Sequence, residues 1–242
     1  MTAPERTLGP VEAVIFDWGG TLTQWHDVDF HAESLALSQA VVNTHHDRTE
    51  VTARLHRAGE LVWGRSRDHQ QSATVADLFE EAGLDHDPDL LRAYYDFWEP
   101  HTHPDPEAAP MLQELRATGL RVGVLSNTIW PRAWHDGFFE RDGVLGLFDG
   151  LVYTSELPWT KPSGRAFGAA MAAVGVSEPG RCVYVGDRLF DDVWGAQQAG
   201  MRAVHIPHSA IPHAQIGHSE GVPDAVAHRL RELPRIVANW RP

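Results

Sequence analysis

The 242-residue chain lacks the features that mark secreted and membrane-spanning proteins. Its single cysteine, Cys182, excludes a disulfide within the chain and lies in the apolar run RCVYVGD, where a buried thiol is expected. No apolar run reaches the length of a membrane span, and the first residues, MTAPERTLGP, do not resemble a secretory signal. We therefore expect a cytoplasmic globular protein with no membrane partner.

Positive charge is scarce as well. The chain has 20 lysine and arginine residues against 33 acidic residues, and its formal net charge of −13 argues against nucleic acid as a partner, because a phosphate backbone requires a basic surface. Lys161 is the only lysine, and all other basic residues are arginines. We expect a small-molecule substrate, and the sequence leaves open whether the protein is a monomer or a homodimer.

Five short apolar runs predict buried strands, at residues 11–17, 121–126, 150–155, 181–187 and 202–206. Near-continuous apolar runs are typical of parallel strands that are covered on both faces. Helical patterns at 107–118, 163–174 and 189–199 alternate with them, and each is followed by a glycine. The alternation predicts an α/β fold with a doubly wound parallel sheet. Residues 224–240 are expected to form an amphipathic helix that closes the sheet.

Residues 24–104 interrupt this alternation. They contain no clear strand, and helical spacing occurs at 29–42, 50–63, 74–83 and 89–98, followed by a proline-rich exit. We therefore expect two domains, an α/β catalytic core formed by residues 1–23 and 105–242 and a helical cap formed by residues 24–104. Trp25, Trp63 and Trp98 are expected to pack within the cap and hinge, although residues 63–65 could instead contact the substrate as a cap loop.

Polar side chains follow four of the predicted strands. Asp17 follows the first, Ser126 ends the second, Lys161 comes soon after the third, and Asp187 follows the fourth with Asp192 just beyond it. In open α/β sheets, ligands bind outside the carboxyl ends of the strands. Crowded carboxylates repel one another unless a cation lies among them, and oxygen ligands suit Mg²⁺. Lys161 and Ser126 are then available to bind an anionic substrate.

These stretches resemble, in the same order, the four motifs of the haloacid dehalogenase-like hydrolase superfamily. They are FDWGGTLT with Asp17, VLSNT with Ser126, TKP with Lys161 and VGDRLFDDVWGA with Asp187 and Asp192. The resemblance covers residues 11–206, and the helical insertion resembles the C1 α-helical cap of one subgroup. It implies a Rossmann-like core and a magnesium-dependent hydrolase of a small phosphorylated metabolite, acting through an aspartyl-phosphate intermediate.

The resemblance also implies a role for each matched residue. Asp17 would be the nucleophile, Ser126 and Lys161 would bind the transferring group as catalytic residues, and Thr21 would also fix the nucleophile loop. The full set comprises the catalytic residues Asp17, Ser126 and Lys161, the substrate-binding residues Gly20, Thr21 and Asn127, and the Mg²⁺ ligands Asp17, Gly19 (through its carbonyl), Asp187 and Asp192, the last directly or through water.

Gly19 departs from the family pattern, because phosphatases of this family usually carry a general acid there. That help is worth ~10²–10⁴-fold in rate. Three explanations stay open: a leaving group that departs without a proton, such as an anomeric or acyl phosphate; a substitute acid, with His26 as the nearest candidate; or a weakly active or non-catalytic ligand-binding protein.

A 2-haloacid dehalogenase is an alternative, because halide leaves without a proton, whereas phosphonoacetaldehyde hydrolases require a cap lysine that this chain lacks.

Arg188 is expected to pair with Asp191 or to reach into the pocket, and Asp191 itself to favour a helix N-terminus. The histidines of residues 205–218 are assigned to a surface loop rather than to a zinc site. They are His205, His208, His213 and His218.

Overall fold

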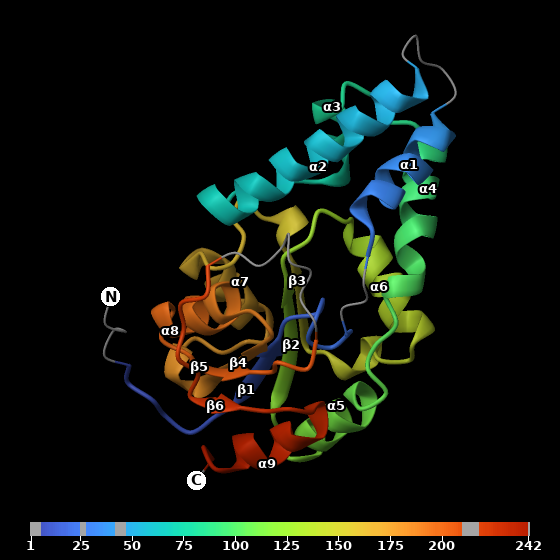
Figure 1. Ribbon diagram of the computed structural model, residues 1–242. Helices are drawn as coiled ribbons and strands as arrows, with labels where there is room; N and C mark the ends of the chain where they lie inside the picture. The colour runs from blue at the N-terminus through green and yellow to red at the C-terminus, as the bar shows by residue number, and fades with distance from the viewer. Residues whose placement is uncertain (1–5, 25–27, 42–46, 210–217, 242) are drawn as a thin grey trace.

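The computed structural model describes residues 6–24, 28–41, 47–209 and 218–241. Within these ranges six parallel strands form one sheet in the order β3-β2-β1-β4-β5-β6 (Figure 1), which confirms the predicted doubly wound α/β fold. Strand β1 lies near the middle because it pairs with both β2 and β4. The strands are β1 (Ala13–Phe16), β2 (Arg121–Ser126), β3 (Gly150–Tyr153), β4 (Cys182–Gly186), β5 (Arg202–His205) and β6 (Ala225–Val226).

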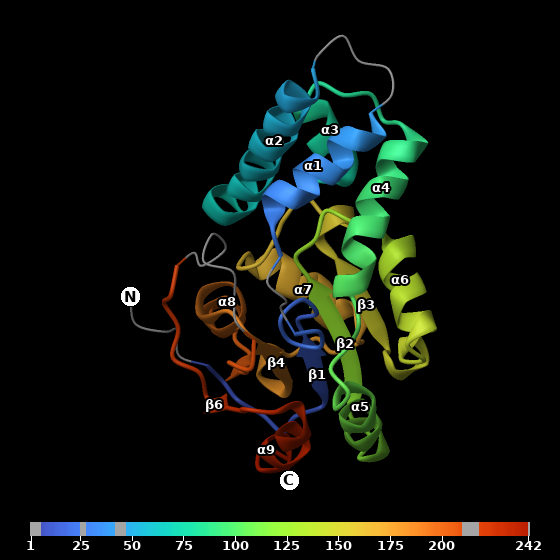
Figure 2. The same cartoon turned by 45° about the vertical axis from the view of Figure 1, so that its right-hand side comes forward.

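Helices cover both faces of the sheet. Successive residues of β1 point to opposite faces, so Val14 and Phe16 join one apolar cluster while Ala13 and Ile15 join the other. Both faces are fully buried at β1, which explains why its sequence is continuously apolar. The helices are α5 (Ala108–Ala117), α6 (Arg132–Arg141) and α9 (Leu233–Ala238) on the first face, and α7 (Gly164–Ala173) and α8 (Gly195–Gln198) on the second (Figure 2).

A group of helices between β1 and α5 lies over the end of the sheet at which β1 and β2 terminate (Figures 1 and 2). These helices begin next to Asp29, Asp47, Thr74 and Asp87, whose side chains accept hydrogen bonds from backbone amides of the first turn. None of the helices that the structure describes is both long enough and apolar enough to span a bilayer. The helices are α1 (Phe30–Ala40), α2 (Arg48–His69), α3 (Val75–Glu81) and α4 (Pro88–Trp98).

The C-terminal segment differs from its prediction. The single helix expected over residues 224–240 is wrong in its first half, because Ala225 and Val226 instead form β6 beside β5. Helix α9 begins only at Leu233, and Pro234 lies in its first turn, where its missing N–H costs no helical hydrogen bond. The helix still packs on the sheet, since Leu233 and Val237 are buried in the first-face cluster.

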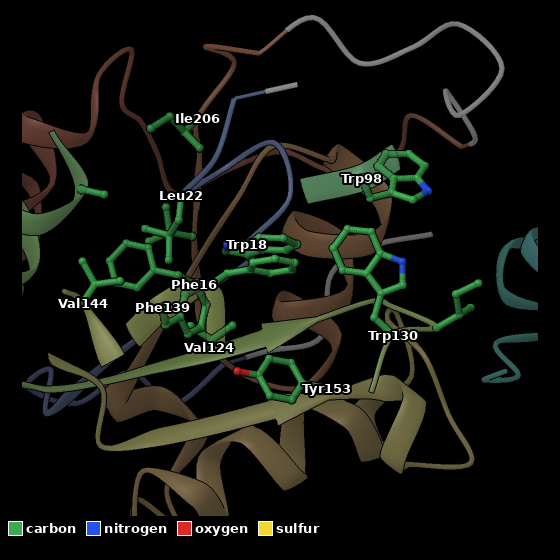
Figure 3. Packing of buried hydrophobic residues seen from close by; sticks show 14 of the residues in the cluster. Phe16, Trp18, Leu22, Trp98, Val124, Trp130, Phe139, Val144, Tyr153 and Ile206 are labelled. Carbon is green, nitrogen blue, oxygen red and sulfur yellow. The ribbon is translucent and has the colours of Figure 1, made fainter. Parts of the chain in front are cut away.

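Tryptophans join the sheet to the helices above it (Figure 3). Trp18 follows β1, Trp130 precedes α6, and Trp98 ends α4. The ring centroid of Trp130 lies 5.7 Å from that of Trp18 and 5.6 Å from that of Trp98. One continuous apolar cluster therefore extends from the first face of the sheet into the helical segment.

Candidate active site

Three polar side chains meet at the carboxyl ends of neighbouring strands. Asp17 follows β1, Ser126 is the last residue of β2, and Asp187 follows β4. The backbone amide of Asp17 donates to the carbonyl of Val185 at 2.8 Å, so the β1–β4 pairing continues one step past the strand. Asp17, Ser126 and Asp187 are all buried, and they point away from the apolar cores toward the space above the sheet edge.

Lys161 lies between two carboxylates. Its Nζ donates to Oδ1 of Asp17 and to Oδ1 of Asp192, each at 2.7 Å, and all three side chains are buried. Burial opposes the ammonium charge, but the two carboxylates outweigh it and raise the pKa of Lys161 well above its ordinary value. Burial raises the pKa of Asp17 to about 6, and the positive charge of Lys161 limits that rise. At neutral pH Asp17 therefore remains mostly ionised.

Asp187 lacks the hydrogen bond that Asp17 and Asp192 each accept from Lys161. Both of its carboxylate oxygens are buried and have no hydrogen-bond partner in the described part of the chain. Burial, followed by the charge of Asp17, raises its pKa well above the ordinary value. Asp17, Asp187 and Asp192 offer carboxylate oxygens that all lie within 4.8 Å of one another. An unpartnered buried carboxylate is costly, so this cluster fits a hard cation, which prefers such oxygen ligands.

The segment after β4 brings Asp192 back to the site. Residues 189–194 form a π-helical turn, and Oδ2 of Asp192 accepts the backbone N–H of Arg188 at 2.9 Å. A Cβ on Gly186 would lie 2.3 Å from Cγ of Asp192, so only glycine permits this approach. Gly186 is not among the site residues predicted from the sequence, although a glycine that ends a buried strand beside an aspartate is a visible signal. Arg188 and Asp191 both line the cavity above the site, and the charge of Arg188 opposes the rise in pKa that burial causes at Asp191.

The turn after Asp17 is tightly closed. The backbone amides of Thr21, Leu22 and Thr23 all donate to the carbonyl of Trp18. Gly20 has a φ of 89°, which side chains other than glycine rarely adopt. Oγ1 of Thr21 is buried and has no hydrogen-bond partner among the described residues. The turn thus presents backbone groups to the cavity, and at Gly19 it presents no side chain.

Asn127 supports the loop that carries the lysine. Its Oδ1 accepts the backbone N–H of Lys161 at 2.8 Å, and its Nδ2 donates to the carbonyl of Lys161 at 3.2 Å. The side-chain amide is therefore engaged with the protein, while Asn127 also lines the cavity. Its observed contribution is to fix the backbone from which Lys161 reaches Asp17.

Two of the late histidines contact the site backbone. A ring nitrogen of His205 lies 2.9 Å from the carbonyl of Asp187, and one of His208 lies 3.1 Å from the carbonyl of Gly20. The surface-loop assignment is wrong for these two, because they pack against the segments that carry Asp17 and Asp187. The remaining expectation for His26 and Trp25, like that for His213, concerns positions outside the described residues.

A cavity of about 490 Å³ opens above the strand ends. Its floor contains Asp17, Ser126, Lys161 and Asp187, whereas aromatic side chains form much of its wall. Most of the wall aromatics come from the helical segment. The expected packing role is wrong for Trp63, whose side chain lines the cavity and remains 39% exposed within helix α2 rather than in a loop. The wall aromatics are Trp18, Phe30, Trp63, Tyr94, Trp98, Trp130 and Phe190.

Comparisons with known proteins agree with this geometry. A family model described as haloacid dehalogenase-like hydrolase matches residues 11–200. A glyceraldehyde 3-phosphate phosphatase from Methanopyrus kandleri is 29% identical over 234 residues, which cover 94% of this chain and 97% of that protein. The crystal structure of a HAD phosphatase from Thermococcus onnurineus matches with a TM-score of 0.67 and 26% identity, covering 96% of this chain and 100% of that one. An L-2-haloacid dehalogenase from Xanthobacter autotrophicus shares the fold, with a TM-score of 0.63, 20% identity and coverage of 94% and 98%.

Proposed function

Because the chain belongs to the family of haloacid dehalogenase-like hydrolases, we propose that it is a magnesium-dependent phosphatase of a small phosphorylated molecule. The observation that supports this most directly is the ammonium of Lys161, which lies 2.7 Å from Asp17 at the floor of the cavity. A phosphoryl group carries negative charge, so its approach to a carboxylate nucleophile requires such a cation. The phosphatase name of a relative that matches over nearly its whole length also supports the proposal.

Asp17 is the proposed nucleophile. One of its carboxylate oxygens attacks phosphorus, the bond from phosphorus to the leaving-group oxygen breaks, and that oxygen keeps the electron pair. Water then attacks the phosphorus of the aspartyl phosphate, which releases inorganic phosphate and restores the carboxylate, while the proton of the water passes to solvent. Burial raises the pKa of Asp17 to about 6, and the ammonium of Lys161 opposes this rise and so favours the ionised nucleophile.

The neighbouring residues orient the phosphoryl group. Lys161 and the hydroxyl of Ser126 would bind its oxygens, Gly20 would contribute from the turn, and Asn127 would keep Lys161 in place. Thr21 is buried and does not line the cavity, so we propose that it fixes the turn rather than contacts the substrate. The residues proposed to bind Mg²⁺ are Asp17, Asp187, Asp192 and, through its carbonyl, Gly19. When bound, Mg²⁺ supplies positive charge that offsets the charge of the phosphoryl group.

We propose that residues 24–104 act as a cap over a core formed by residues 1–23 and 105–242. The cap would exclude water from the aspartyl phosphate and contact the rest of the substrate. Backbone hydrogen bonds already join the two parts near the site. The amide of Thr160 donates to the carbonyl of Gln70 at 3.0 Å, and that of Ser72 donates to Pro158 at 3.3 Å. The end of α2 is thereby coupled to the loop that carries Lys161.

A phosphate-release assay tests the proposed function. Its panel contains sugar 1-phosphates, acetyl phosphate and 4-nitrophenyl phosphate, each with Mg²⁺ and with a chelator. We expect magnesium-dependent release by the wild-type protein and background release by Asp17→Asn, because the amide is a far weaker nucleophile. Wild-type turnover in Asp17→Asn would reject the assigned nucleophile. Halide release from 2-chloropropionate without magnesium would support the dehalogenase alternative, and magnesium binding without any turnover would support a non-catalytic protein.

A further inference from the structure

An exposed tryptophan faces the cavity. Trp63 lies on α2, lines the cavity, and keeps 39% of its surface accessible. Leu61 lies two positions earlier, is 53% exposed and is not part of the cavity wall, so it contacts solvent on another side of the same helix. An aromatic side chain left open on the wall of a polar-floored cavity is a surface on which an apolar part of a ligand can stack.

The neighbouring wall rings are fixed by the protein. Nε1 of Trp98 donates to Glu33 at 2.8 Å, and Nε1 of Trp130 donates to the hydroxyl of Tyr94 at 3.4 Å. Both indole N–H groups are therefore satisfied within the protein, and both side chains are buried, so they bound the cavity as a fixed apolar wall. Polar side chains also occur around the cavity above its floor, among them Gln24, Ser66, Arg67 and His101. The wall combines ordered aromatic surface with polar groups at its margin, as in sites that bind rings.

Gly19 restricts the leaving group independently of the wall. No acidic side chain is available at this position to protonate a departing oxygen. A phenol has a pKa of ~10, as tyrosine does, whereas water, which resembles an alkyl alcohol in this respect, has a pKa of ~16. A phenolate therefore departs without a general acid far more easily than an alkoxide does.

We propose that the substrate is an aryl phosphate monoester, in which phosphate esterifies a phenol-type hydroxyl. This inference rests on the proposed phosphatase function. Asp17 attacks phosphorus, the bond between phosphorus and the aryl oxygen breaks, and a phenolate leaves with the electron pair and takes its proton from solvent. The ring stacks on Trp63, the one exposed tryptophan among the described wall residues. The volume is sufficient, since a cavity of ~150 Å³ holds benzene and this one measures about 490 Å³.

Four phosphorylated compounds, three monoesters and one acyl phosphate, separate ring recognition from leaving-group ability. Phenyl phosphate has both a ring and a good leaving group, benzyl phosphate has only the ring, acetyl phosphate has only the good leaving group, and ethyl phosphate has neither. We expect the highest kcat/KM for phenyl phosphate and the lowest for ethyl phosphate. A preference for acetyl phosphate over phenyl phosphate would overturn the inference and leave the phosphatase proposal standing. Release from none of the four, with no release from the sugar phosphates, would instead contradict the phosphatase proposal itself.

A pair of variants on one helix tests the stacking residue. We expect Trp63→Ala to lower kcat/KM for phenyl phosphate by roughly three- to tenfold and to leave acetyl phosphate unchanged. Leu61→Ala, which removes a more exposed apolar side chain outside the cavity, should change kcat/KM for neither substrate. Both sites are exposed, so both variants should keep the wild-type unfolding temperature. An equal loss on all substrates, or no loss on phenyl phosphate, would overturn the assignment of Trp63.

Discussion

At the scale of single residues, the site contains more negative charge than the protein alone balances. The ammonium of Lys161 donates hydrogen bonds to Asp17 and Asp192, whereas the oxygens of Asp187 have no hydrogen-bond partner among the described residues. The side chain that the proposed function needs for a metal is thus one that destabilises the metal-free fold. This conflict between stability and function gives a test that does not depend on activity.

We predict that Asp187→Asn stabilises the metal-free protein by roughly 1–3 kcal/mol, because burial raises the pKa of Asp187 and folding at neutral pH must therefore either bury an unpaired charge or take up a proton. The same change should abolish the rise in unfolding temperature that Mg²⁺ causes in the wild-type protein. Thermal unfolding with a chelator and with Mg²⁺ measures both effects. Asp191→Asn is the control, since Asp191 lies outside the carboxylate cluster and its variant should keep the magnesium shift. A destabilised Asp187→Asn that still responds to Mg²⁺ would contradict this account.

A second residue-scale prediction concerns Gly19. Restoring an acid by Gly19→Asp should raise the turnover of ethyl phosphate by about 10²-fold, the lower end of general acid catalysis. Phenyl phosphate should gain much less, because its leaving group departs without a proton. Steady-state kinetics on both esters checks this, and Gly19→Asn controls for the added volume without an acidic proton. Equal gains on both esters, or a gain that Asn reproduces, would count against our explanation of Gly19.

Sequence patterns located much of the site at this scale. Asp17, Ser126 and Asp187 could be placed because each ends a strand of recognisable apolar character, and parallel strands end at one edge. The bond from Lys161 to Asp192 and the contact of His205 with Asp187 could not be predicted. The first depends on the π-helical turn that carries Asp192, and the second depends on the residue at which β5 ends. Neither feature has a sequence signal as regular as an apolar run.

At the scale of elements, helices α1 and α4 are joined by a buried polar contact. Glu33 of α1 accepts a hydrogen bond from Trp98 of α4 at 2.8 Å. Burial raises the pKa of Glu33 to about 7, although Trp98 and then Tyr94 oppose the rise. The contact orients Trp98 in the cavity wall, so the same carboxyl affects both helix pairing and the shape of the cavity.

We predict that Glu33→Gln changes how stability depends on pH. An acid whose pKa is raised by folding stabilises the fold below its unfolded-state pKa, and this contribution is lost as the pH rises through the folded-state value of about 7. The variant should therefore match the wild type near pH 4.5 and exceed it by roughly 1–3 kcal/mol at pH 8. Urea unfolding at both pH values measures the difference. A variant that is less stable than the wild type at pH 8 would contradict the raised pKa.

Elements were predictable where their pattern is regular. The five expected strands and three of the four helices over residues 29–98 occur within a few residues of their predicted bounds, because apolar periodicities and capping side chains mark them. Helix α2 continues to His69, six residues beyond its predicted end at residue 63. Helix α6 was missed, since its sequence RAWHDGFFER mixes charges with aromatic residues and has no early apolar repeat. Strand β6 has two residues and depends on its neighbour β5, so its own sequence carries no signal.

At the scale of the whole molecule, the cavity is a product of distant segments. Its wall brings together Phe30, Trp63, Trp98 and Trp130, which come from three separate helices and the loop before α6. The local amino-acid sequence does not distinguish a tryptophan that packs in the core from one that faces a cavity. The sequence therefore predicts a packing role for Trp63, which the structure contradicts. One continuous apolar cluster joins the sheet to the helical segment. The position of the cavity wall therefore depends on how the two parts of the chain pack together.

The central claim is that Asp17 carries the phosphoryl group during turnover. The most direct measurement is to mix the protein with phenyl phosphate and Mg²⁺, quench in acid within the first turnovers, and map phosphorylated peptides by mass spectrometry. Our account predicts a phosphoryl adduct on Asp17 in the wild-type protein and none in Asp17→Asn. Phosphate release that proceeds with no adduct at Asp17, or with the adduct on another residue, would contradict it.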